Sequence, residues 1–94
     1  MREDELRTIS LFKALANPVR YKILKTLAID EQSVTQLSLV LGRKVSIISQ
    51  HLSVLRHNQL VRFHTRRNKV FYRIKKKEVL SLLQKANDIV KRKG

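Results

Sequence analysis

The chain has 94 residues, of which 21 are Lys or Arg and 7 are Asp or Glu, so its formal net charge at pH 7 is +14 with His neutral. An apolar content of 43% is too high for a disordered basic tail, and the length supports one folded domain over residues 1–94. The absence of cysteine excludes disulfides and thiolate chemistry and fits a reducing cytoplasm, and neither a membrane span nor a signal peptide is recognisable.

Apolar residues spaced three or four apart predict a first helix that begins at the acidic run 3–5. These acids fit the positive end of the helix macrodipole, which favours helix stabilisation over catalysis. Asn17 is suited to an N-cap and Pro18 to the first helical position, so a second helix is expected to begin there. The apolar faces would contain Leu6, Ile9, Phe12, Leu15 and Ala16 in the first helix, and Val19, Ile23, Leu24 and Leu27 in the second.

Two further helices are predicted on either side of Gly42. Ser33 and Gln36 have the spacing of a capping box, and Gly42 suits the left-handed residue that ends a helix. The next helix would run from about residue 45 to residue 57. The inward residues would be Val34, Leu37, Val40 and Leu41 in the third helix, and Val45, Ile48, Leu52 and Leu55 in the fourth.

The residue pattern changes after the fourth helix. Residues 60–64 and 70–74 are rich in β-branched and aromatic side chains, and the polar segment 65–69 between them is basic, which predicts a β-hairpin with a basic tip. Residues 78–91 return to a helical period, and the cations at 91–93 suit the negative end of that helix. Its apolar stripe would contain Val79, Leu82, Leu83, Ala86, Ile89 and Val90.

Two short helices around a glycine turn, followed by a hairpin, have the order of a winged helix-turn-helix. The predicted fold class is therefore mainly α, with five helices and a two-stranded antiparallel wing.

The positive charge is concentrated in the middle of the chain. No acid occurs from Gln32 to Lys77, a pattern that a solvated surface of mixed charge does not show. A polyanion such as a phosphate backbone is the simplest partner, with a basic surface kept only for solubility as the alternative. An anionic membrane is disfavoured, because no helix sets a basic face against Trp or Phe. The cations of this segment are Arg43, Lys44, Arg56, Arg62, Arg66, Arg67, Lys69, Arg73, Lys75, Lys76 and Lys77.

The fourth predicted helix has an uncharged outer face. At about 100° per residue, this face opposite the core stripe carries small hydroxyls, which allow a helix to enter the major groove. Gln50 can pair with the N6 and N7 edges of adenine. Ile47, at the flank, fits a thymine methyl group, although an exposed isoleucine is also common without a ligand. Arg43 and Lys44 precede the helix, where phosphates would lie. The outer face consists of Ser46, Gln50, Ser53 and His57.

Three segments together resemble the ArsR/SmtB family of winged-helix repressors. The run from Leu11 to Arg20 (LFKALANPVR) is similar to the family's opening, and residues 45–56 (VSIISQHLSVLR) are similar to its recognition helix. Residues 60–61 and 70–74 match its wing strands, so the similarity covers about residues 9–75.

The resemblance implies a homodimer held by the first and last helices, which represses transcription by occupying a partly palindromic operator in double-stranded DNA. Val45 also falls where the family meets DNA, but its place on the core stripe leaves it out of the expected set. Base readout is expected from Ser46, Ile47, Ser49, Gln50 and His51, backbone contact from Arg43, Lys44, Ser53, Arg66, Arg67 and Lys69, and dimer contact from Leu6, Ile9, Phe12, Leu82, Leu83, Ala86, Ile89 and Val90.

The sequence departs from the family's metal sensors. Residues 33–37 hold no cysteine where such sensors carry ligands, and the last helix has no histidine. His51 and His57 would point about 240° apart on one helix and cannot share an ion, and His64 lies on a predicted strand. We therefore expect no metal, no other cofactor and no response through the usual metal sites.

Other classes of function were weighed against a regulator. An enzyme is disfavoured, because the three histidines have neither a cysteine nor a nearby acid to form a catalytic group. A non-specific architectural DNA-binding protein is the main alternative, and a protein-interaction module is opposed by the basic middle segment. Small cysteine-free regulators of this composition resemble those of archaea and their viruses.

Overall fold

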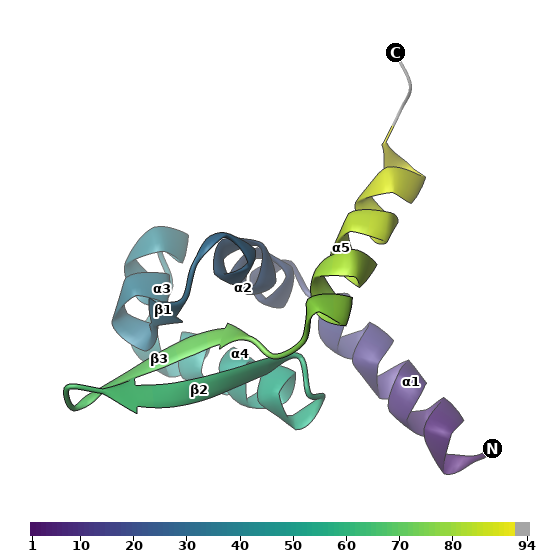
Figure 1. The fold of residues 1–94 in the computed structure, drawn as a ribbon, viewed down its shortest axis with the longest axis horizontal. Coiled ribbons are helices and arrows are strands. Elements are labelled where there is room, and N and C mark those ends of the chain that lie inside the picture. The colour runs from purple at the N-terminus through teal and green to yellow at the C-terminus, as the bar shows by residue number, and fades with distance from the viewer. Residues whose placement is uncertain (92–94) are drawn as a thin grey trace.

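The computed structural model describes residues 1–91, so the predicted role of the cations at 92 and 93 falls outside the described residues. The observed elements confirm five helices and a wing (Figure 1). In chain order they are α1 (Glu3–Leu15), α2 (Pro18–Ile29), β1 (Gln32–Ser33), α3 (Val34–Leu41), α4 (Val45–His57), β2 (Val61–Arg66), β3 (Lys69–Ile74) and α5 (Lys77–Val90).

The predicted helix ends are confirmed by their hydrogen bonds. The side chain of Asn17 accepts bonds from the amides of Val19 and Arg20 at 3.0 and 3.1 Å, with Pro18 as the first helical residue. The hydroxyl of Ser33 caps α3. Gly42 ends α3 in the left-handed region at φ 65°, which gives a sharp turn into α4.

The sheet has three strands, one more than predicted. The extra strand β1 pairs antiparallel with β3, which places Gln32 opposite Tyr72 and Ser33 opposite Phe71. Two residues are too few to show an alternating pattern, and Ser33 also serves as the cap of α3, so the segment reads as a polar break in sequence. The strand order is β1-β3-β2.

The hairpin turn is tighter than predicted. Both strands extend toward the tip, and only Arg67 and Asn68 separate them. The φ angles of these two residues are 51° and 64°, as in the mirror-image two-residue turns that match the twist of paired strands. Leu60, predicted at the start of the first strand, precedes it and is buried in the core.

A single buried cluster joins α2, α3 and α4 to one face of the sheet. Two predicted inward residues are instead exposed, Val40 at 62% and Val45 at 48%. Val40 lies beside the α3 stripe formed by Val34, Leu37 and Leu41, so it points past the core. Val45 is the first residue of α4, and side chains lean toward a helix N-terminus, which carries it beyond the end of the core.

The two terminal helices project from this body (Figure 1). Each is buried against the body only near its inner end, at Ala14 of α1 and Val79 of α5, whereas most of the apolar residues farther out are exposed. Leu83 of α5 packs partly against the core, and the Ser10 hydroxyl of α1 donates to the Asn58 side chain. The exposed large apolar residues on these helices are Leu6, Ile9, Phe12, Leu80, Ile89 and Val90.

Candidate nucleic-acid interface

The outer face of α4 is exposed and uncharged, as the helical angles predict. Ile48, Leu52 and Leu55 are fully buried, so the opposite face of the helix faces solvent. Ile47 is exposed at 37%, on the flank of the outer face. The outer face residues Ser46, Gln50, Ser53 and His57 are all exposed, and Ser49 is exposed on the flank. A helix with such short side chains can approach base edges closely.

The N-terminus of α4 favours an anion. Lys44 is the N-cap residue and provides no side-chain cap, so the first-turn amides of the helix lack that partner. Arg43 and Lys44 add positive charge where a helix macrodipole is already positive. The turn itself is fixed by Ser38, whose carbonyl accepts from the Arg43 amide at 3.2 Å and whose hydroxyl donates to the Arg43 carbonyl. A phosphate here would satisfy both the amides and the cations.

His51 differs from its neighbours on α4, because it is partly buried and bonded to Arg20. A guanidinium only donates, so the neutral His51 ring accepts at Nδ1, 3.2 Å from Arg20 Nη1, and carries its proton on Nε2. Burial, followed by the charges of Arg20 and Arg43, lowers the pKa of His51 below its ordinary value. The structure therefore holds a neutral imidazole with an Nε2–H donor at this position.

Arg20 is a residue behind the α4 surface whose contacts the sequence reasoning did not identify. Its Nε donates to the Ala14 carbonyl at 2.8 Å and its Nη2 to the Lys13 carbonyl at 3.3 Å, while Nη1 contacts His51. One side chain thus connects the end of α1 to α4. Its place just after Asn17–Pro18 is visible in the sequence, but its partner on α4 is not.

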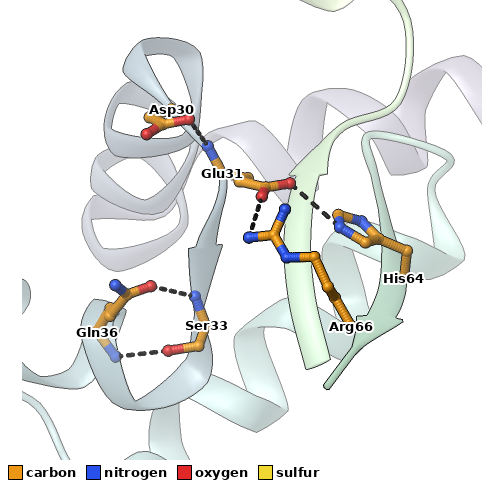
Figure 2. A network of polar contacts seen from close by, with 6 residues as sticks. All are labelled: Asp30, Glu31, Ser33, Gln36, His64 and Arg66. Carbon is orange, nitrogen blue, oxygen red and sulfur yellow. Dashed lines mark hydrogen bonds and ion pairs between the residues drawn. The ribbon is translucent and has the colours of Figure 1, made fainter. Parts of the chain in front are cut away.

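The wing is held to the body by Glu31, a second residue that was missed (Figure 2). Its carboxylate lies 3.0 Å from Arg66 Nη2 and 3.3 Å from His64 Nε2. The Arg66 guanidinium also lies over the Phe71 ring, 4.7 Å from its centroid. Arg66, predicted to contact the DNA backbone, is therefore positioned by an acid and a ring. Glu31 was not singled out because strand β1, which follows it, was not predicted.

The other wing cations lie at the tip. Arg67 and Lys69 are exposed on and beside the turn, and among residues 1–91 neither has an acidic partner within 4.0 Å. Arg43, Lys44, Arg67 and Lys69 thus supply positive charge around the uncharged face of α4.

Within residues 1–91, no three side chains of His, Cys, Asp or Glu come together as a metal-binding group. In the same range, no helix has both the length and the apolar character needed to cross a membrane.

A short helix, a glycine turn and an exposed second helix beside a basic hairpin define a winged helix-turn-helix DNA-binding domain. The model of the bacterial regulatory protein, arsR family, matches residues 17–62. The chain is also 36% identical over 84 residues to the transcriptional activator HlyU of Vibrio cholerae, an alignment covering 89% of this chain and 78% of HlyU. The protein belongs to the ArsR family of DNA-binding transcriptional regulators.

Further similarities agree with this assignment. The structure of HlyU from Vibrio cholerae matches with a TM-score of 0.83 over 96% of this chain and 98% of HlyU, at 33% identity. The homodimeric winged helix-turn-helix DNA-binding domain of Mb0332 from Mycobacterium bovis matches with a TM-score of 0.86 at 25% identity, over 95% of this chain and 86% of that one. The transcriptional repressor SmtB homolog of Synechocystis is 30% identical over 77 residues, covering 82% of this chain and 58% of the homolog.

These relatives are bacterial regulators, and they give no support to the archaeal origin expected from composition. Because the family is one of transcriptional regulators, it agrees with the prediction that the chain is not an enzyme.

Proposed function

We propose that the chain binds a partly palindromic operator as a homodimer, with α4 in the major groove and the wing on the adjacent backbone. The observation that carries this proposal is the short, uncharged outer face of α4 with cations around it. Bases would be read by Ser46, Ile47, Ser49, Gln50 and His51, and the backbone would be held by Arg43, Lys44, Ser53, Arg66, Arg67 and Lys69.

The dimer would form through the terminal helices. Their exposed apolar residues need cover, and the similar domain of Mb0332 is homodimeric. A two-fold dimer would place its two α4 helices about one helical turn apart on DNA, roughly 34–36 Å. The contact residues would be Leu6, Ile9, Phe12, Leu82, Leu83, Ala86, Ile89 and Val90.

Repression is the proposed output, because a protein bound across an operator excludes the transcription machinery from the same DNA. The relatives include both a transcriptional activator and a transcriptional repressor by name. A reporter gene placed behind the selected binding site would decide between them: deletion of the regulator should raise expression. A fall in expression would contradict repression.

Regulation through the family's usual metal sites is not part of the proposal. Residues 33–37 and α5 lack cysteine and histidine, and α5 carries only Glu78 and Asp88 as acids. Added zinc should accordingly leave the affinity for the operator unchanged within about twofold in a fluorescence titration.

We propose that the protein acts in the cytoplasm, where it has access to chromosomal DNA.

Selection of duplexes from a random pool at fixed salt tests the central proposal. A palindromic consensus is expected. Gln50→Ala should reduce the difference in binding free energy between specific and random duplexes by about 1–3 kcal/mol. Lys69→Ala is the matched comparison, since it should weaken binding to both duplexes alike and lower the salt slope by about 0.9.

A pool that yields no consensus would instead favour the non-specific architectural protein. An unchanged affinity ratio in Gln50→Ala would remove the assignment of Gln50 to base readout.

A further inference from the structure

The register of the hairpin divides its side chains between two faces. Because side chains alternate along a strand and paired residues share a face, Val61 and Ile74 lie on the inner face, against the core. The pairs 63–72 and 65–70 share this inner face, and the alternate pairs fall on the opposite face, which we call the outer sheet face. It consists of three cross-strand pairs: Arg62 with Arg73, His64 with Phe71, and Arg66 with Lys69.

Two of these three pairs join like charges. Side chains directly opposite each other have Cβ atoms about 4.5–5.5 Å apart, and like charges at that separation destabilise a sheet. Glu31 is the acid that reaches this face, and its carboxylate is already shared by His64 and Arg66. Among residues 1–91, neither Arg62 nor Arg73 has an acidic partner within 4.0 Å. An external anion would relieve the repulsion at this pair.

The outer sheet face and the outer face of α4 lie on opposite sides of the core. Leu52 of α4 and Val61 of β2 are both buried in the same cluster, between the two surfaces. Figure 1 shows β2 and β3 in front of α4. Arg62 and Arg73 are also at the end of the hairpin far from the turn at residues 67–68. A duplex held by α4 and the wing tip would leave this arginine pair uncovered.

We propose that the Arg62–Arg73 end of the outer sheet face binds the phosphate backbone of a second DNA duplex, so that the protein bridges two duplexes. Arg62 and Arg73 are directly opposite each other, so their Cβ atoms are about 4.5–5.5 Å apart and their guanidinium groups can bind neighbouring phosphates of one DNA strand. The bridge needs the α4 surface to hold the first duplex, so it rests on the proposed function.

A capture assay tests this proposal with the full-length protein. A 40-base-pair duplex that contains the selected operator is fixed to beads, protein is added to saturation, and recovery of a second, fluorescent duplex of the same length and mixed sequence is measured. Wild type should recover the second duplex. The double variant Arg62→Gln with Arg73→Gln should recover at least tenfold less, while the amount of protein on the first duplex stays within twofold.

The matched control is Lys22→Gln with Lys25→Gln, two exposed cations of α2 that lie on neither surface. Both double variants remove two positive charges, so general charge effects are equal. The control should recover the second duplex as wild type does. Removing the like-charge pair should leave the melting temperature unchanged or higher, which excludes unfolding as the cause.

Equal recovery by the two double variants would overturn the proposal. A wild type that recovers no second duplex would also overturn it. Either result would favour an acidic protein as the partner of this face. If the wild-type protein does not bind the first duplex, that result would instead contradict the proposed function. The two failures are therefore measured separately.

Discussion

The central body and the terminal helices carry the same pattern of apolar residues, yet they bury them to different extents. In α2, Ile23 and Leu24 are fully buried. In α1, Leu6 and Phe12 remain 54% and 56% exposed. The pattern predicts which face of a helix is apolar, but not whether the same chain covers it. We interpret the body as a unit with its own core and the terminal helices as surfaces that need a partner.

The largest expected effect lies in the body. Leu24→Ala removes a fully buried side chain and leaves a cavity, which should cost about 2–5 kcal/mol of unfolding free energy. Urea denaturation followed by circular dichroism measures this loss. A cost below about 1 kcal/mol would contradict a tightly packed body.

A smaller effect is expected in α1, and it should fall on association. Phe12→Ser removes an exposed aromatic ring whose burial in a dimer is worth about 1.5–3 kcal/mol. Sedimentation should therefore show a dissociation constant of the dimer at least tenfold larger than that of the wild type. Leu39→Ser is the control, because Leu39 is 78% exposed on the body and outside the predicted interface. Equal dissociation in both variants, or none in Phe12→Ser, would contradict the role of α1.

The turn between α3 and α4 gives a further, smaller effect within the body. Gly42 adopts φ 65° and has open space around it, so Gly42→Ala meets backbone strain and no clash. The left-handed conformation should cost about 1–2 kcal/mol of stability. Thermal unfolding measures this cost, and an unchanged melting temperature would mean that the turn relaxes freely.

The smallest effect concerns the junction between the two regions, where Arg20 links α1 to His51. The pKa of His51 is lowered in the folded state, so the unfolded state binds more protons as the pH falls below the ordinary histidine value of about 6.5. Stability should therefore decrease as pH falls through this range toward the lowered folded-state pKa.

Urea midpoints between pH 7.5 and pH 5 test this dependence. His51→Gln should flatten it, whereas His57→Gln, on the exposed face, should keep the wild-type profile. Identical profiles in the two variants would remove His51 as the source.

Local signals in the sequence predicted most of the fold. Asn17 and Gly42 act through their own backbone neighbourhoods, so their roles as helix ends were recognisable and are confirmed. Strand β1 was missed because pairing with a strand nearly forty positions later defines it, and two residues carry no period. Val40 was placed wrongly because its burial depends on where α3 sits against its neighbours.

In the candidate site, as in the fold, the local features were predictable and the long-range contacts were not. The exposed face of α4 follows from helix geometry, so its members were found from angle alone. The contacts of Arg20 with His51 and of Glu31 with Arg66 each join segments more than thirty residues apart. No local pattern encodes such contacts, since they arise only when the elements pack.

The ion pair between Glu31 and Arg66 changes how a salt titration should be interpreted. A phosphate that binds Arg66 replaces a carboxylate, so that step exchanges one anion for another and liberates fewer small ions than binding to an unpaired cation. The number of phosphate contacts inferred from the slope of log affinity against log salt will then be smaller than the number of cations that contact DNA. Glu31→Gln should steepen this slope.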